Sequence, residues 1–304
     1  MSEPLVWLPF DPSELGEVPA GLRYEVVPTL DEVPASVGEV ELVVTPYDLG
    51  DQLGEAVKGM ERLRVVQTLT AGVDAVRASV PAGVTLCNGR GIHDTSTAEL
   101  AFLLVLAGLR DLPRFVRAQD RREWSPAWRG ALAGKRVSVV GAGSIASALQ
   151  RRLEAFEAEV TMVGRTARDG VRATDELPSL LPEQDVVVLL VPLTDATRGL
   201  VDADFLAALP DGALLVNVAR GAVVDTDALL AELGTGRLRA ALDVFETEPL
   251  PDDSPLWDAR GLILTPHVGG LSDAMWPRAY RLVREQLERF AAGEPLENVM
   301  DGDY

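Results

Sequence analysis

The chain contains little cysteine and little histidine. Among its 304 residues are one cysteine, Cys87, and two histidines, His93 and His267. A single cysteine cannot form an intrachain disulfide, which excludes the disulfide-stapled scaffolds of small secreted proteins and fits a reducing compartment. Because imidazole is the side chain that most often transfers protons near neutral pH, a histidine-dependent enzyme would have to use one of these two residues.

The chain also lacks long apolar runs and any excess of basic residues. Its longest apolar run, Leu100–Leu109, is far shorter than the ~20 residues that a membrane-spanning helix needs. No secretion signal is recognisable, so we expect a cytoplasmic protein. The formal net charge of −19 is spread along the chain, which disfavours nucleic acid and anionic membranes as partners. A small anionic substrate stays compatible, since one or two arginines suffice to bind it. We expect no bound metal.

Short apolar runs alternate with helical or turn-rich stretches in the first 90 residues. Runs of this length, separated by helical patterns, indicate a parallel sheet built from βα units. The predicted strands are 6–8, 24–27, 42–45, 65–69 and 85–87.

A second series of strands and helices starts at Arg136. Six strands separated by helices are the count of a complete doubly wound dinucleotide-binding domain. A final helix, about 273–292, follows the sixth strand, and we expect it to pack on the first domain. The strands predicted in this series are 137–140, 160–163, 186–191, 213–218, 240–245 and 262–264.

The segment between the two series begins with a helix over 95–109. Thr95 or Ser96 is expected to cap it, with Glu99 completing a capping box. The helix is apolar on nearly every side, which predicts burial between domains or between subunits; we favour a contact between two subunits. Residues 114–134 are charged and contain two tryptophans, and we expect an irregular excursion on the surface.

A strand, a glycine turn and an amphipathic helix stand together at 137–156. Gly141 follows the apolar strand at once and permits a tight turn, and Gly143 lets backbone amides approach a pyrophosphate at the start of the helix. Ala146 takes the third position, where a small residue allows close packing of helix on strand. This context predicts a dinucleotide cofactor. The contacts expected at this turn are Gly141, Gly143, Ser144 and Ile145.

The end of the second strand of this series distinguishes NAD(H) from NADP(H). Sites that prefer NAD place an Asp or Glu about 20 residues after the turn, to bind the ribose 2′-hydroxyl. Here the chain reads Gly164-Arg165-Thr166, with no carboxylate before Asp169. A guanidinium beside a hydroxyl would bind a 2′-phosphate, which a carboxylate would repel. We therefore predict NADP(H) in preference to NAD(H), with contacts from Arg165 and Thr166; the alternative is that Arg165 is an ordinary surface arginine.

Three later strands are followed by an arginine, a carboxylate and an imidazole. Arg220 comes after strand 213–218, Glu248 after strand 240–245, and His267 after strand 262–264. Because the carboxyl ends of parallel strands share one edge of a sheet, we expect these three side chains to meet in one crevice. Gly269 and Gly270 would let the backbone approach a flat ring.

These motifs together resemble the D-isomer-specific 2-hydroxyacid dehydrogenase family. The resemblance rests on Gly141–Ala146, Asn217–Gly221, Asp243–Pro249 and 265–270, together with Ala71-Gly72-Val73-Asp74 and, in the interdomain segment, Asn88 and Ala98-Glu99. It implies an α/β protein with two doubly wound parallel-sheet domains. A Rossmann cofactor domain, residues 91–271, would be inserted into a flavodoxin-like substrate-binding domain made of 1–90 and 272–304.

The resemblance also implies roles for single residues. Arg220 would bind the substrate carboxylate and polarise the keto oxygen, and His267 would donate a proton to that oxygen. Glu248 would hydrogen-bond the far ring nitrogen of His267, and the backbone amides of Ala71 and Gly72 would complete the carboxylate site. Further cofactor contacts are expected at Thr97, Pro192, Thr197, Val218, Ala219, Asp243 and Gly269.

The function expected from the residues and the resemblance is reduction of a small 2-oxo acid. The substrate would be of the glyoxylate/hydroxypyruvate type, the product a D-2-hydroxy acid, and the enzyme a homodimer. Two alternatives stay open: an NAD-linked D-2-hydroxyacid or phosphoglycerate dehydrogenase, and a corepressor-like protein that senses a dinucleotide without turnover. Arg90 and His93 depart from the family pattern and would either contact the substrate or belong to a helix cap. Trp276 would line the pocket or, as we favour, lie in the core.

Overall fold

The structure is a computed structural model that describes residues 3–47 and 52–301. The chain divides into two units: the first unit is Met1–His93 with Asp273–Tyr304, and the second unit is Asp94–Ser272. The second unit is therefore inserted into the first along the chain.

The first unit contains a five-stranded parallel sheet in the order β2-β1-β3-β4-β5. This is the doubly wound order of flavodoxin-like folds. All five strands predicted from the sequence are confirmed, with ends that differ by at most two residues. The strands are β1 (Leu5–Leu8), β2 (Arg23–Val26), β3 (Val40–Val44), β4 (Val65–Gln67) and β5 (Thr85–Cys87), and the helices are α1 (Gln52–Ala56) and α8 (Met275–Ala292).

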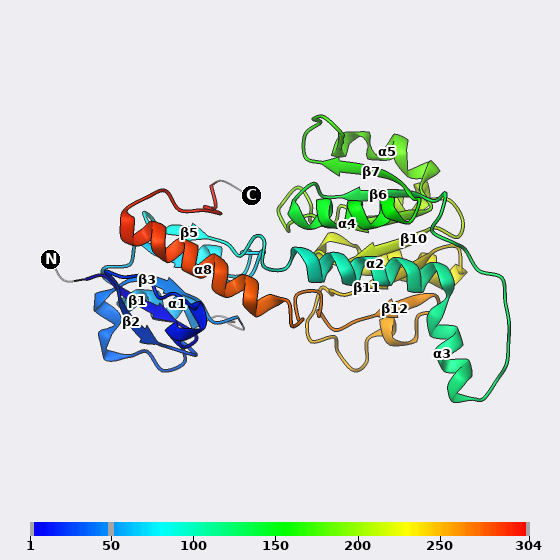
Figure 1. Ribbon diagram of the computed structural model, residues 1–304. Coiled ribbons are helices and arrows are strands. Elements are labelled where there is room, and N and C mark those ends of the chain that lie inside the picture. Colours follow the sequence, from blue (N-terminus) through cyan, green and yellow to red (C-terminus); the bar gives the residue numbers. More distant parts are fainter. Residues whose placement is uncertain (1–2, 48–51, 302–304) are drawn as a thin grey trace. The chain divides into compact units, whose positions relative to one another are not determined.

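Apolar side chains cover both faces of this sheet. The amphipathic helix α8 buries Ala279, Val283 and Leu287, spaced four residues apart, against one face (Figure 1). The expectation that the final helix packs on the first domain is thus confirmed. Trp7, on the opposite face, is buried with residues of α1 and of the short 3-10 turns. Each fully buried leucine or valine contributes about 1.5–3 kcal/mol of hydrophobic free energy to such a core.

The second unit contains a seven-stranded parallel sheet in the order β12-β11-β10-β9-β6-β7-β8. Its order reverses between β6 and β9, as in a Rossmann domain. The strands are β6 (Arg136–Val140), β7 (Glu159–Gly164), β8 (Val171–Ala173), β9 (Val186–Leu189), β10 (Leu214–Asn217), β11 (Arg239–Leu242) and β12 (Leu262–Leu264). The helices are α2 (Asp94–Arg110), α3 (Leu112–Asp120), α4 (Ser144–Ala155), α5 (Leu177–Leu180), α6 (Ala203–Ala208) and α7 (Thr226–Thr235).

The six predicted strands of this unit are confirmed, and a seventh was missed. That strand, β8, has three residues with the charged Arg172 in the middle, and none of the three is fully buried. A short, half-exposed edge strand has too little apolar pattern to stand out from a loop.

Helices cover both faces of the larger sheet. α2 and α4 pack together on one face, which α2 contacts at β10 and β11 (Figure 1). α5, α6 and α7 bury their apolar residues on the other face. In doubly wound sheets, ligands bind at the loops that follow the carboxyl ends of the strands.

The start of α2 differs from the prediction. The helix begins at Asp94, so Thr95 and Ser96 lie within its first turn. Glu99 forms an ion pair with Arg152 of α4 at 3.2 Å and does not close a capping box. Along the helix, Leu103 is 53% exposed within this chain. α2 is therefore buried on one side only by its own unit, and the subunit contact stays a prediction.

The segment 114–134 was expected to be irregular throughout, which is wrong for its first part. Residues 112–120 form helix α3, separated from α2 by Asp111 in the left-handed conformation at φ 53°. Leu112, Phe115 and Val116 have helical spacing, a signal that the many charged residues obscured. The remainder is irregular and exposed, and Trp124 and Trp128 are 96% and 99% exposed.

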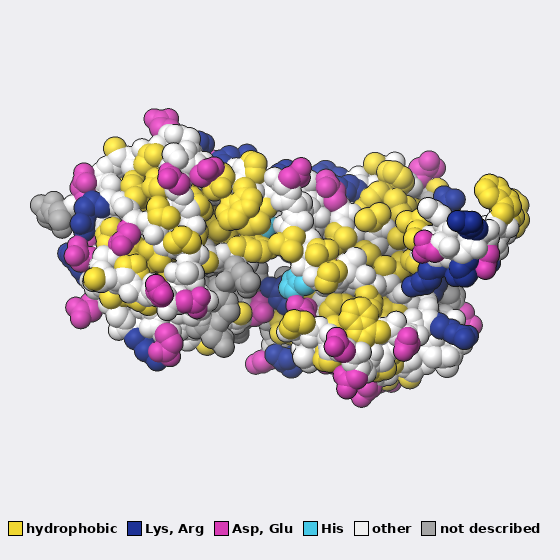
Figure 2. Space-filling model, turned by 90° about the horizontal axis from the view of Figure 1, so that it is seen from below, with side chains coloured by type: hydrophobic (Ala, Val, Ile, Leu, Met, Phe, Trp, Pro, Cys, Tyr) yellow, Lys and Arg dark blue, Asp and Glu magenta, His cyan; other side chains and the backbone are white. Residues whose placement is uncertain are grey.

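The surface carries mixed charge. On the face shown in Figure 2, acidic side chains are dispersed among basic and hydrophobic ones over both units. Within residues 3–47 and 52–301, no helix is long and apolar enough to cross a membrane.

Candidate active site

The glycine turn joins β6 to α4 at the carboxyl edge of the larger sheet. Gly141 has φ 125°, and a Cβ there would lie 2.3 Å from the carbonyl oxygen of Leu190, so a side chain is excluded by both strain and contact. Its amide donates to the carbonyl of Val163 at 2.7 Å. Gly143 is the N-cap of α4 and provides no side-chain cap, and a Cβ on it would point into open space. This helix start fits a pyrophosphate, because the first amides of a helix have no intrahelical acceptor and the space beside Gly143 is open.

Ser144 and Ile145 follow the turn. The Ser144 hydroxyl donates to Asp94 Oδ1 at 3.0 Å, which ties the start of α4 to the start of α2. Ile145 is half-buried and packs on the core shared by α2 and α4. Both residues thus lie where the sequence placed them, at the first turn of the helix after the glycines.

Arg165 and Thr166 are exposed in the loop after β7. The same loop carries a contact that sequence reasoning missed: the Arg168 guanidinium donates from Nη2 to the carbonyl of Ala142 at 2.8 Å. This bond holds the loop against the glycine turn. Nothing in the local pattern marks it, because arginine is common on exposed loops.

The other expected cofactor residues lie in loops of the second unit. Thr197 donates to the carbonyl of Pro192 at 2.6 Å, so these two residues belong to one turn after β9. Thr97 donates to the carbonyl of Gly269 at 3.1 Å, although 172 positions separate them. Val218 and Ala219, after β10, are buried.

The three expected catalytic residues lie in loops after three neighbouring strands, β10, β11 and β12. His267 Nδ1 and Glu248 Oε2 are 2.6 Å apart, and the second oxygen of Glu248 accepts from the Phe245 amide at 2.8 Å. The positive charge of Arg220 acts to lower the pKa of both groups. The nearby Glu246 is exposed and accepts from the hydroxyl of Thr226.

Close backbone packing lets these loops approach one another. A Cβ on Gly221 would lie 1.8 Å from the carbonyl carbon of Phe245, so only glycine allows the loop of Arg220 to lie against the loop of Glu248. Asn217 fixes the backbone on either side of Ala219, donating to the Arg220 carbonyl at 2.9 Å and accepting from the Ala219 amide at 3.0 Å.

The His267–Glu248 pair shifts both titrations. The hydrogen bond and charge of Glu248 raise the pKa of His267 above its ordinary value, against burial and the positive charge of Arg220. Burial acts to raise the pKa of Glu248, yet the hydrogen bonds from His267 and the Phe245 amide, with the charges of His267 and Arg220, lower it overall. The pair therefore favours an ionised carboxylate beside a protonated imidazole, with Nε2 available as an acid.

Asp243 has a role that the sequence did not reveal. Its buried carboxylate accepts from the Thr265 hydroxyl at 2.6 Å and from the amides of Val268 and Gly269 at 2.9 Å each. Its carbonyl accepts from the His267 amide at 2.8 Å. His267 has φ 52°, an uncommon conformation for a residue other than glycine, and these bonds hold it there. A buried carboxylate directly after a strand is the signal that could have indicated such an anchor.

Ala71 and Gly72 belong to the first unit, in the turn after β4. Their carbonyls accept hydrogen bonds from Asn88 Nδ2 and from the Thr70 hydroxyl, both at 2.8 Å. Within the described ranges, neither amide N–H of these two residues donates to another protein group. The turn thus offers two adjacent amides.

Three residues that the sequence left open also lie in the first unit. His93 is buried, and its Nε2 lies 3.0 Å from the carbonyl of Leu69. The Arg90 amide donates to Asn88 Oδ1. Trp276 is 40% exposed and stacks on Tyr280, so our preference for a core position is wrong.

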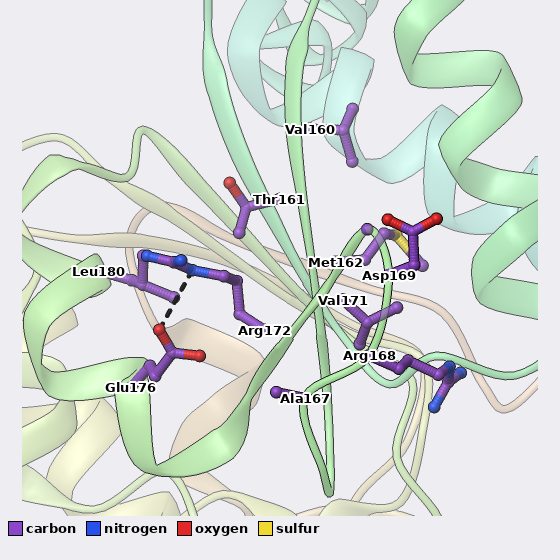
Figure 3. Close-up of a pocket in the computed structure, with 11 residues that line it drawn as sticks. Val160, Thr161, Met162, Ala167, Arg168, Asp169, Val171, Arg172, Glu176 and Leu180 are labelled. Carbon is purple, nitrogen blue, oxygen red and sulfur yellow. Dashed lines mark ion pairs between the residues drawn. The ribbon is translucent and has the colours of Figure 1, made fainter.

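An open cavity of about 610 Å³ lies beside β7 and β8 (Figure 3). It forms because β8 pairs only with Met162–Gly164, which leaves Val160 and Thr161 on an edge without a further strand. Arg172 and Glu176 form an ion pair at 3.2 Å on one side of it. None of the expected site residues lines this cavity. In the part of the chain that the structure describes, no three His, Cys, Asp or Glu side chains are grouped to bind a metal.

Comparison with known proteins agrees with this geometry. The model of the "D-isomer specific 2-hydroxyacid dehydrogenase, NAD binding domain" matches residues 102–269. The chain is 33% identical to D-3-phosphoglycerate dehydrogenase of Methanocaldococcus jannaschii, over 92% of this chain but only 58% of that enzyme. The chain thus spans little more than half the length of that relative.

Two solved structures are similar over nearly the whole chain. A D-isomer specific 2-hydroxyacid dehydrogenase from Xanthobacter autotrophicus, crystallised with NADPH and MES, is 32% identical with a TM-score of 0.83, over 99% of this chain and 98% of that one. An NADPH-dependent glyoxylate/hydroxypyruvate reductase from Sinorhizobium meliloti, crystallised with NADP and malonate, is 28% identical with a TM-score of 0.82, over 98% and 97%. The chain belongs to the D-isomer specific 2-hydroxyacid dehydrogenase family and is an NAD(P)-dependent oxidoreductase of that family.

Proposed function

We propose that this enzyme uses NADP(H) to reduce a small 2-oxo acid of the glyoxylate/hydroxypyruvate type to the D-2-hydroxy acid. The observation that carries the proposal is the 2.6 Å bond between His267 and Glu248 beside Arg220, in loops after three adjacent strands. Reduction of a keto group beside a carboxylate requires a proton donor and a cation, and an imidazole of raised pKa with a nearby guanidinium can supply both. The similarity to the Sinorhizobium reductase supports the same substrate class.

The residues of the second unit fit the cofactor that the family implies. Gly141 permits the tight turn against Leu190, Gly143 leaves open space at the start of α4 where a pyrophosphate would bind, and Ser144 and Ile145 follow in its first turn. Arg165 and Thr166 are exposed, with no carboxylate before Asp169 in their loop, and would bind the 2′-phosphate. Thr97, Pro192, Thr197, Val218, Ala219, Asp243 and Gly269 would complete the site. When bound, the reduced nicotinamide supplies a hydride.

The chain's own residues then bind and protonate the substrate. The Arg220 guanidinium would bind the substrate carboxylate and polarise the keto oxygen. His267 would donate the proton on Nε2 to that oxygen, while Glu248 on Nδ1 fixes the ring and favours its charged form. The two free amides of Ala71 and Gly72, in the first unit, would bind the carboxylate as well.

We also propose that the enzyme is a homodimer. The apolar helix α2 leaves Leu103 exposed and Phe102 and Leu106 only partly buried within one chain, which supports a subunit contact on this helix. Light scattering of the purified protein tests this, and a monomer at micromolar concentration would contradict it.

The experiment that tests the function is a panel of 2-oxo acids assayed with NADPH and with NADH. We expect the highest kcat/KM with glyoxylate or hydroxypyruvate and NADPH, and D-glycerate as the product from hydroxypyruvate. Turnover confined to 3-phosphohydroxypyruvate with NADH would favour a phosphoglycerate dehydrogenase instead. Binding of NADPH without oxidation by any 2-oxo acid would favour a dinucleotide sensor.

A further inference from the structure

A chain of buried amide side chains runs through the first unit and ends at the turn of Ala71 and Gly72. Gln67 ends β4, Asn88 follows β5, and Gln286 lies on α8. Their exposed fractions are 1%, 3% and 2%. Buried amides destabilise a fold unless their donors and acceptors are paired, so such a group persists where its bonds are made.

The bonds link the three side chains in a line. Gln286 Nε2 donates to Gln67 Oε1 at 2.8 Å, and Gln67 Nε2 donates to the Asn88 carbonyl at 3.1 Å. The second donor of Gln67 goes to the Thr68 carbonyl at 2.8 Å. Asn88 Nδ2 donates to the carbonyl of Ala71 at 2.8 Å. The line thus starts on α8 and ends at the turn of Ala71 and Gly72.

The C-terminal segment is tied into the same line. Gln286 Nε2 donates to the Glu297 carbonyl at 3.0 Å, and its Oε1 accepts from the Glu297 amide at 2.8 Å. The Asn88 amide donates to the Asn298 carbonyl at 3.0 Å, and Val299 forms an antiparallel bridge with Cys87. Residues 297–300 therefore lie along the end of β5 and fix Asn88 from the far side.

The other bonds at the turn hold its carbonyls. The Thr70 hydroxyl donates to the Gly72 carbonyl at 2.8 Å, and the Gly89 amide donates to the Thr70 carbonyl at 2.7 Å. The Ala71 and Gly72 amides share their peptide planes with the Thr70 and Ala71 carbonyls, which accept from the Gly89 amide and from Asn88 Nδ2, so both amides are held in a fixed direction. Neither amide donates to another described protein group. A fully bonded polar network gives this kind of directional rigidity.

We propose that Gln286, Gln67 and Asn88 are positioning residues that orient the Ala71–Gly72 amides toward the substrate carboxylate. This proposal rests on the proposed function, in which those amides bind a 2-oxo acid. None of the three residues touches the substrate. The helix α8 and the segment 297–300 thereby determine how tightly the carboxylate is bound.

The test is Gln286→Met, which keeps the length of the side chain but removes both its donors and its acceptor. We expect KM for glyoxylate or hydroxypyruvate to rise about tenfold, with kcat and KM for NADPH within about twofold of the wild type, because only the carboxylate turn is loosened. Val283→Ala is the matched control: Val283 lies on the same helix, is fully buried, and has no polar side-chain atom to take part in the hydrogen-bonded line. It should lower the melting temperature and leave KM unchanged.

Asn88→Ala removes the last link and serves as a second variant if Gln286→Met does not fold. It should raise KM for the 2-oxo acid at least as much. Unchanged KM in the folded amide variants, or an equal rise in Val283→Ala, would overturn the proposal. Turnover of the wild type separates the two hypotheses. If the wild type reduces the 2-oxo acid and the variants keep its KM, only this inference is contradicted. If the wild type does not reduce any 2-oxo acid, the proposed function fails, and this inference fails with it.

Discussion

The glycine turn after β6 and the histidine loop after β12 lie at the same edge of one sheet but work in different ways. Gly141 and Gly143 matter by having no side chain: Gly141 lets the turn pack against the Leu190 carbonyl, and Gly143 leaves open space at the start of α4. His267 would act through its side chain, whose pKa Glu248 raises, and the Asp243 carbonyl accepts from its amide. The first loop is suited to anchoring a cofactor, and the second to proton transfer. Substitutions in the two loops should therefore separate cofactor binding from turnover.

Arg220→Ala should produce the largest loss of catalytic efficiency. We expect kcat/KM for the 2-oxo acid to fall by about 10²–10³-fold, since a charge-assisted contact to both carboxylate and keto oxygen is removed. NADPH affinity, measured by fluorescence titration, should stay within about twofold. Arg220→Lys keeps the charge without the planar fork, and it should recover only part of the loss. Full activity of Arg220→Ala would show that another group binds the carboxylate.

Gly141→Ala should weaken the binding of NADPH. Its Cβ would meet the Leu190 carbonyl at 2.3 Å in a backbone conformation with φ 125°, a strain of about 1–3 kcal/mol. NADPH should bind about 10–100-fold more weakly. Gly234→Ala in α7, where a Cβ meets nothing within 4 Å, is the control and should bind NADPH as the wild type does. Wild-type NADPH affinity in Gly141→Ala would remove the turn from the cofactor site.

Arg165→Ser tests which group of the cofactor site distinguishes NADPH from NADH. Loss of the guanidinium should lower the ratio of kcat/KM for NADPH to that for NADH about tenfold, because only the 2′-phosphate distinguishes the two. Arg151→Ser, an exposed arginine on α4, controls for the change in net charge. An unchanged ratio would mean that Arg165 is an ordinary surface residue.

Glu248→Gln should have the smallest effect at neutral pH and a clear effect on the pH profile. His267 has a raised pKa, mainly through its hydrogen bond to Glu248, so reduction should hold at low pH and decline as pH rises through that pKa. Without the carboxylate, this decline should move to lower pH. Glu246→Gln, whose carboxylate accepts from Thr226, should leave the profile in place. Identical profiles for Glu248→Gln and the wild type would contradict the pairing.

The same pair makes folding stability depend on pH. The raised pKa of His267 contributes stability that is full below the ordinary imidazole pKa of 6.5 and is lost as pH rises through the raised value. The lowered pKa of Glu248 contributes stability that is present above 4.5 and is lost as pH falls through the lowered value. The window in which both contribute fully lies between these two ordinary values.

Much of the fold followed from local patterns, because buried parallel strands are continuous apolar runs and the glycine turn has few other uses. The strand-end arginine, glutamate and histidine could also be placed, since parallel strands bring their carboxyl ends to one edge. What failed depended on contacts distant in sequence. Glu99 pairs with Arg152, and the short β8 exists only because β7 lies beside it.

The anchoring groups were hidden for the same reason. Asp243 fixes a loop 22 to 26 residues further along, and Gln67 meets Gln286 at a separation of 219 residues. A single sequence gives no sign of such a pair, because it does not distinguish a buried glutamine from an exposed one. Burial and hydrogen-bond partners revealed them.

Turnover and NADPH binding of His267→Ala, measured on one protein sample, decide whether His267 is the proton donor. We expect kcat for the 2-oxo acid to fall at least ~10²-fold while the dissociation constant for NADPH stays within about twofold. Near-normal turnover would contradict the assignment of His267 as the proton donor. A parallel loss of NADPH binding would contradict the division of work between the two loops.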